Sequence, residues 1–103
     1  MKIENLPNYQ KNSIVSKELQ RKESGTVTYF AFDQGEGLSE HTAPFDALIF
    51  IVEGEAEIMI DSKPNHLTQG EIIIMPANHP HAVNAIKPFK MLLVMIKSPN
   101  KAV

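Results

Sequence analysis

The sequence contains no cysteine among its 103 residues. Disulfides, thiolate metal sites and cysteine nucleophiles are therefore excluded. It also has no excess of basic residues, since 10 lysines and arginines face 12 acidic residues for a net charge of −2. Such a chain has little charge with which to bind a phosphate backbone or an anionic membrane. We expect neither nucleic acid nor membrane as a partner, and any reactive site must use histidine and carboxylate.

Long apolar runs are absent as well. The longest are residues 48–52 and 72–75, which suit buried strands and fall far short of the roughly 20 residues of a membrane helix. The polar residues 1–12 lack the apolar core of a signal peptide. We therefore expect a cytoplasmic protein. The sequence also lacks a phosphate-binding glycine loop, a serine nucleophile elbow and a paired-carboxylate signature.

What is present is a series of short apolar segments, separated by glycine, proline and asparagine, that begins near Gly25. No helical periodicity persists for three turns. This pattern predicts an all-β sandwich or barrel. The expected strands cover residues 26–33, 38–42, 47–52, 56–60, 66–67, 72–75, 81–86 and 89–96, with a turn at residues 61–65.

Alternation of side chains along a strand indicates which face is buried. Ala56, Ile58 and Ile60 share one face of their strand and are expected to point inward. The last strand, residues 89–96, is apolar on both faces, so we expect it to be covered on both sides.

The N-terminal residues 1–25 form a separate part of the pattern. They are mostly polar, with a strand-like segment at residues 13–19. We interpret them as an arm with a short strand that covers a sheet edge of its own chain or of a partner. Residues 26–103 would then form the barrel.

Two groups of glycine, proline and histidine residues have a characteristic spacing. The first group is Gly35, His41 and Gly54, and the second is Gly70, Pro76 and His81. This spacing resembles that of the cupins, in particular the small single-domain bacterial cupins with one conserved barrel of the RmlC-like type. The resemblance spans residues 26–96. It implies a small antiparallel double-stranded β-helix, or jelly-roll barrel, and a homodimer with the N-terminal arm at its interface.

The departures from the cupin pattern concern the metal ligands. The family's second histidine and its glutamate correspond to Ala43 and Ala47. Only His41 and His81 carry over from the four ligand positions. Asp46 is displaced by one residue from the glutamate position, which turns its side chain to the opposite strand face. Asn84 is displaced in the same way from the family's terminal asparagine, which is Ala85 here.

His79 is a candidate third ligand. It precedes His81 by two residues, and Pro80 favours an extended backbone between them, so both rings could project to one side. With His41 they would form a three-nitrogen set that suits a divalent transition metal such as zinc, iron, nickel, manganese or copper. The alternatives are that His41 and His81 line a metal-free pocket and that His79 is an exposed loop residue. We assign no role to His66.

The two alanines also leave space inside the barrel. Ala43, Ala47, Ile49, Met91 and Leu93 are expected to line a pocket beside His41 and His81, and such an apolar lining would keep buried imidazoles neutral. Three functions remain open. The protein binds a small, mainly apolar molecule in the barrel, or it is a metal-dependent isomerase or dioxygenase with a reduced histidine site, or it is a structural dimer without a site. The methionines are interpreted as core residues.

Overall fold

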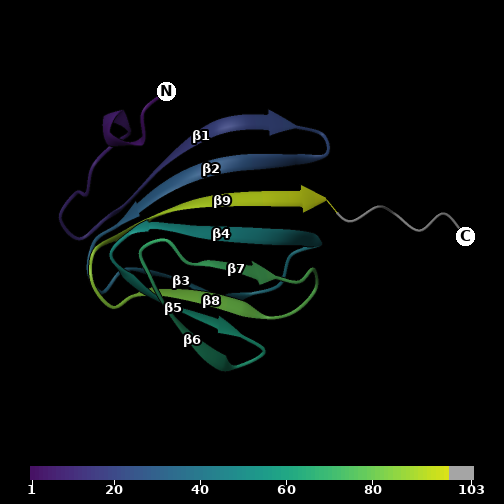
Figure 1. Cartoon of the computed structure of the whole chain (residues 1–103). Coiled ribbons are helices and arrows are strands. Elements are labelled where there is room, and N and C mark those ends of the chain that lie inside the picture. Colours follow the sequence, from purple (N-terminus) through teal and green to yellow (C-terminus); the bar gives the residue numbers. More distant parts are fainter. Residues whose placement is uncertain (98–103) are drawn as a thin grey trace, which may run out of the picture.

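The computed structural model describes residues 1–97, which form two antiparallel β-sheets packed face to face (Figure 1). A short 3-10 turn, η1, precedes the strands. The bounds of the elements in these residues are η1 Ile3–Asn5, β1 Ile14–Lys22, β2 Gly25–Phe32, β3 Gly37–His41, β4 Phe45–Glu53, β5 Glu55–Ile60, β6 Lys63–Thr68, β7 Ile72–Met75, β8 His81–Ala85 and β9 Phe89–Lys97.

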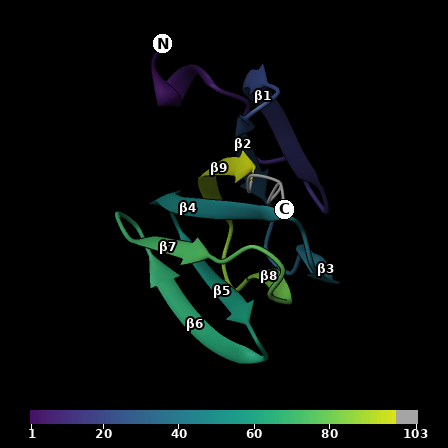
Figure 2. The same cartoon turned by 90° about the vertical axis from the view of Figure 1, so that its right-hand side faces the viewer.

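The larger sheet has the strand order β1-β2-β9-β4-β7, and the smaller sheet has the order β3-β8-β5-β6. Figure 2 shows the two layers close together near β7 and β6 and further apart toward β1 and β3. The predicted all-β jelly-roll barrel is therefore confirmed. Among consecutive strands only β1–β2 and β5–β6 are hydrogen-bonded neighbours, and every other connection between β1 and β9 crosses to the other layer. Residues from distant parts of the sequence therefore line the interior.

The core lies between the layers and is built from every second residue of the inner strands. Ile49 and Ile51 of β4 and Ile58 of β5 are fully buried. Ala56 is fully buried too and Ile60 packs against the same cluster, which confirms the predicted inward face of β5. This alternation is the expected result for an antiparallel sheet with one face on a core.

The last strand, β9, differs from its prediction at one end. Its inner face is buried, as Phe89 and Met91 illustrate. On the outer face Leu92 is half-buried, but Ile96 is 59% exposed. Covering on both sides is thus confirmed only for the first half of the strand, because the N-terminal residues extend over that half alone.

The residues before β1 lie against the outer face of their own larger sheet. Leu6 is buried there beside Tyr29. The Tyr29 hydroxyl donates to the Pro7 carbonyl oxygen at 2.6 Å, and the Tyr9 hydroxyl donates to Glu53 Oε2 at 2.7 Å. The expected short strand is longer than its sequence indicated, since β1 spans nine residues with a bulge after Glu18.

The turn expected at residues 61–65 is shorter in the structure. Asp61 and Ser62 alone connect β5 to β6, and both have positive φ angles of 51° and 63°. Two central residues with positive φ are typical of a type I′ turn, whose twist matches that of a hairpin. Pro64 therefore lies within β6, which is possible because β6 is an edge strand.

Gly54 connects the two sheets at a crowded point. Its φ is +88°, and a Cβ here would collide with the Pro88 carbonyl oxygen. Only glycine satisfies both conditions. The last six residues of the predicted barrel, 98–103, lie outside the described residues. Within residues 1–97 no helix has the length and apolar character that crossing a membrane requires.

Candidate functional site

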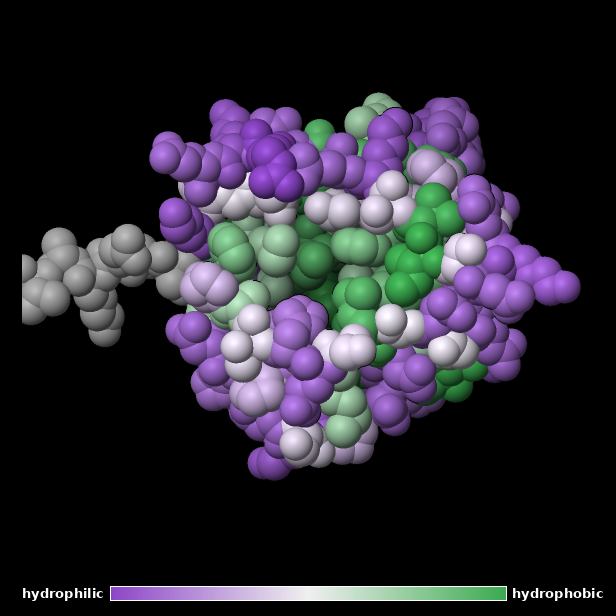
Figure 3. Space-filling view, turned by 180° about the vertical axis from the view of Figure 1, so that it is seen from behind, coloured by the Kyte–Doolittle hydropathy of each residue, from purple (hydrophilic) through white to green (hydrophobic). Residues whose placement is uncertain are grey.

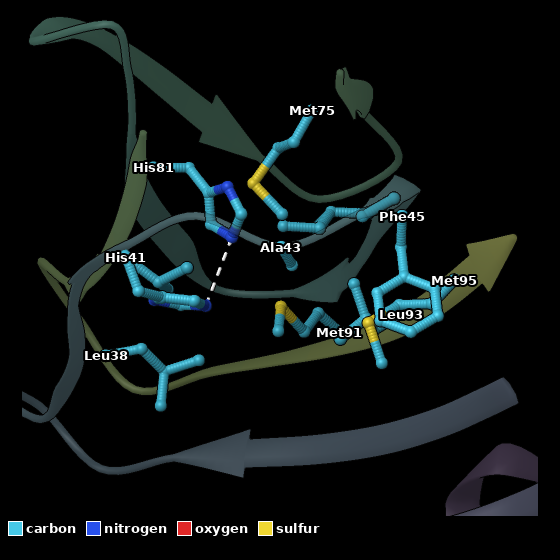
Figure 4. Close-up of a pocket in the computed structure, with 12 residues that line it drawn as sticks. Leu38, His41, Ala43, Phe45, Met75, His81, Met91, Leu93 and Met95 are labelled. Atoms are coloured by element: carbon cyan, nitrogen blue, oxygen red, sulfur yellow. Dashed lines mark hydrogen bonds between the residues drawn. The ribbon is translucent and has the colours of Figure 1, made fainter. Parts of the chain in front are cut away.

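A small cavity of about 50 Å³ lies between the two sheets. Figure 4 shows His41 and His81 from the smaller sheet facing methionine and aromatic side chains from the larger sheet. Figure 3 shows apolar side chains lining a hollow between polar rims. The cavity is lined by Leu38, His41, Ala43, Phe45, Ala47, Ile49, Met75, His81, Val83, Met91, Leu93 and Met95.

His41 and His81 form a directly opposed pair across β3 and β8. Their Nε2 atoms are 3.2 Å apart, and their ring centroids are 4.4 Å apart at an interplanar angle of 69°. The two histidines that the sequence retained are therefore next to each other, although 40 residues separate them along the chain.

Backbone carbonyls fix the orientation of both rings. His41 Nδ1 lies 2.7 Å from the Ser39 carbonyl oxygen, and His81 Nδ1 lies 3.1 Å from the His79 carbonyl oxygen. A carbonyl can only accept, so each Nδ1 must donate its hydrogen. Neutral rings then present bare Nε2 lone pairs to each other, which is repulsive unless a proton, a donor group or a cation lies between them.

The two imidazoles have different surroundings. His81 is only 6% exposed, and burial is the largest cause that lowers its pKa. The hydrogen bond to the His79 carbonyl raises that pKa, and His41 lowers it. His81 is thus held in the neutral form that was expected. His41 is exposed, so the expectation that both histidines are buried was wrong.

The structure does not bring His79 to this pair. Its Nδ1 lies 2.8 Å from Asp61 Oδ2, and both side chains are about half exposed. The three-histidine set expected from the sequence is therefore not formed, because the His79 ring contacts Asp61 in the β5–β6 turn instead. His66, to which no role was assigned, is exposed on the outer surface of β6.

The positions of the two lost ligands lie on the cavity wall. Ala43 and Ala47 both line it, and Ala47 is 4% exposed. Asp46 does not replace the glutamate, since its Oδ1 accepts the Ala77 backbone N–H at 2.9 Å on the other side of β4. Asn84 is exposed on β8. Both side chains point away from the cavity, which is the orientation predicted from their one-residue offsets.

The expected apolar wall is present. Ile49, Met91 and Leu93 line the cavity at the positions that the sequence indicated. Sequence reasoning missed five further lining residues, which come from five different strands: Leu38, Phe45, Met75, Val83 and Met95. Alternation along a strand could have indicated three of them, because Phe45 shares a face with Ala47, Val83 with His81 and Met95 with Leu93. The other two, Leu38 and Met75, depend on the register between strands.

A difference from the family pattern at Asn78 has a local explanation. The cupin pattern has glycine at this position, and Asn78 has a φ of 65°. Asparagine is among the few residues that adopt this left-handed conformation readily. The Asn78 N–H donates to the Ala43 carbonyl oxygen at 2.8 Å, which joins the two motif loops at the edge of the cavity.

The donor set only partly fits the transition metal that many cupins hold. His41 and His81 supply two oriented nitrogens, but residues 1–97 contain no group of three histidine, aspartate or glutamate side chains able to hold a metal. Open metal sites normally keep three protein ligands. A divalent metal here would need its remaining ligands from water, from a bound molecule or from other side chains.

Solved structures with this architecture share substantial sequence with the chain. A cupin 2 conserved barrel domain protein from Leptotrichia buccalis is 43% identical with a TM-score of 0.84, over 86% of this chain and 43% of that one. A conserved protein of unknown function from Streptococcus pyogenes is 35% identical with a TM-score of 0.84, over 88% and 80% of the two chains. A cupin superfamily protein from Desulfitobacterium hafniense is 29% identical, also with a TM-score of 0.84, over 87% and 83%.

A search among curated proteins finds no match to this chain. The model of the cupin domain matches residues 28–96, which include both histidines, both alanines at the former ligand positions, and every strand from β3 to β8. This match and the similarity to the Leptotrichia and Streptococcus proteins lead to one conclusion: the chain belongs to the cupin family.

Proposed function

We propose that this cupin binds a small, mainly apolar molecule in the barrel, with His41 and His81 as the polar contacts. The observation that supports this most directly is the combination of one apolar cavity with two imidazoles whose Nε2 atoms converge at 3.2 Å. Apolar walls with a few convergent polar groups are the usual composition of small-molecule sites.

The cavity limits the size of the molecule. Its volume of about 50 Å³ is a few times the roughly 10–15 Å³ that a cavity needs to hold one water. A ligand would insert a group of only a few heavy atoms, and the rest would lie in the mouth near the exposed His41. Because both Nε2 atoms accept, the inserted polar group must be a hydrogen-bond donor.

Two isomeric probes test this directly. 1-Butanol and methyl propyl ether have the same atoms, but only the alcohol has a hydrogen to donate. We expect the alcohol to bind about 2- to 12-fold more tightly, which corresponds to about 0.5–1.5 kcal/mol for one hydrogen bond. Ligand-observed NMR titration measures both affinities.

Variants connect the preference to the histidines. In His41→Ala and His81→Ala the preference for the alcohol should disappear while the ether still binds. Equal affinities for both probes in the wild type would refute the role of the imidazoles. Absence of any binding by either probe would refute the cavity as a small-molecule site.

The second candidate is a metal-dependent cupin with a reduced histidine site. Its specific support is the spacing of the two nitrogens, since two ligands about 2.1 Å from one metal at an angle near 100° are about 3.2 Å apart. Both Nδ1 atoms donate to backbone carbonyls, and a metal-bound histidine usually makes such a hydrogen bond with its other ring nitrogen. Metal analysis of protein purified without chelators, before and after loading, tests it, and no bound transition metal in either sample would refute it.

We also propose that the chain forms a homodimer. The outer face of the larger sheet carries Ile72, Ile74 and Ile96, each 58–59% exposed, beyond the part that the N-terminal residues cover. Isoleucines so exposed on one sheet face favour burial against a second surface. If the cavity and the histidines prove inert, a structural dimer is the function that remains.

A further inference from the structure

We propose that the cavity is a site for a soft monovalent ion, Cu(I), held by the two imidazole nitrogens and by the thioether sulfurs of Met75 and Met91. This rests on the second candidate function and names its metal and its missing ligands. The donors would be His41 Nε2 and His81 Nε2 from the smaller sheet, with the sulfurs from the larger sheet opposite.

The first support is the concentration of methionine around this one cavity. The chain has five methionines, and Met75, Met91 and Met95 all line it. Met75 is 4% exposed and Met91 is 1% exposed, so their sulfurs are shielded from water. Figure 4 shows the Met75 sulfur directed toward the His81 ring and the Met91 sulfur on the His41 side.

The second support is the register around Ala47. This residue pairs with Met75 of β7 on one side and with Met95 of β9 on the other. The short alanine side chain therefore leaves space on the cavity wall beside Met75, one of the two proposed sulfur ligands. Where a carboxylate would offer hard oxygen ligands, this barrel offers soft sulfur.

The chemistry of the lining selects the ion. Among residues 1–97 no acidic side chain lines the cavity, and manganese and magnesium prefer carboxylate and water oxygens. Thioether sulfur is a ligand for Cu(I), and imidazole also binds copper. A single positive charge also costs less than a double charge to transfer into an apolar site. The bare Nε2 lone pairs would then meet a cation rather than each other.

Anaerobic competition between the metal-free protein and a chromophoric Cu(I) chelator measures the affinity, with Zn(II) and Mn(II) titrations in parallel. We expect one Cu(I) per chain, bound more tightly than Zn(II), and no Mn(II) binding. Met75→Leu combined with Met91→Leu should lower the affinity for Cu(I) at least about tenfold, since even changes to residues that only contact the ligands cause such a loss at metal sites. The affinity for Zn(II) should not change. Leucine is close to methionine in volume, so the fold should survive.

Met59→Leu is the matched control, because Met59 lies on β5 and does not line the cavity. X-ray absorption of the wild-type complex adds a readout that needs no variant, and a copper–sulfur shell is expected. Wild-type Cu(I) affinity in the double variant, or a spectrum without sulfur, would overturn the thioether ligands. If Zn(II) still binds through His41 and His81, the metal function survives that result, and if no metal binds at all, both proposals fail.

Discussion

Replacing Ala47 by valine tests whether the cavity is real space inside the barrel. Ala47 is 4% exposed and lines the cavity between Met75 and Met95. The added methyl groups would enter the cavity, and the flexible methionines can adjust around them. The change should therefore stabilise the fold and at the same time block the site.

The expected gain in the free energy of unfolding follows from the cavity volume. At about 24 cal/mol per Å³, filling the 50 Å³ contributes about 1.2 kcal/mol. Burying two methyl groups at about 0.8 kcal/mol each gives a similar value of about 1.6 kcal/mol. Because the cavity reaches solvent, about 1 kcal/mol is the expected gain, and Tm should rise by about 4–8 °C for a domain of this size.

Urea denaturation of both proteins measures the change, and an unchanged m-value would show that the unfolded state is not affected. Binding of 1-butanol should be lost in the variant. Ala56→Val is the matched control, because Ala56 is fully buried but does not line the cavity. There, overpacking should cost about 1–3 kcal/mol. If Ala47→Val destabilises the protein as much as Ala56→Val does, the cavity is closed in solution and the reasoning is wrong.

Three further predictions concern the rest of the chain. Tyr9→Phe removes the hydrogen bond to Glu53 and should cost about 1–2 kcal/mol in urea denaturation. Burial, followed by that bond, raises the pKa of Tyr9, so the wild type should lose more stability than the variant as the pH rises above about 10; parallel pH curves would contradict this. Burial lowers the pKa of His81. The stability that neutral His81 contributes is therefore present above the unfolded-state pKa of histidine, about 6.5, and is lost as the pH falls. The wild type should therefore lose more stability between pH 7.5 and 5 than His81→Gln, and an equal loss would show that His81 does not titrate as described. In sedimentation analysis the wild type should be a dimer, which Ile74→Lys or deletion of residues 1–20 weakens; a monomeric wild type at micromolar concentration would rule the dimer out.

Much of this protein is determined by its local sequence. Strand positions follow from the alternation of apolar residues between turns, so β5 and β7 lie close to where the pattern indicated them. The spacings of His41 and His81 to glycine and proline fix their place in the family pattern. The inward or outward direction of Asp46 and Asn84 also followed from a one-residue offset, because side chains alternate with a period of two.

Only the tertiary structure decided what surrounds the histidines. Whether a ring such as His79 turns to the barrel or to Asp61 depends on a turn 18 residues away. The convergence of bare nitrogens depends on two backbone carbonyls. Met75 and Met95 flank Ala47 because of the register of three strands that are distant in sequence. Strand propensity and motif spacing are local properties, whereas register and ring orientation depend on contacts between strands, and these decide which donors meet in the cavity.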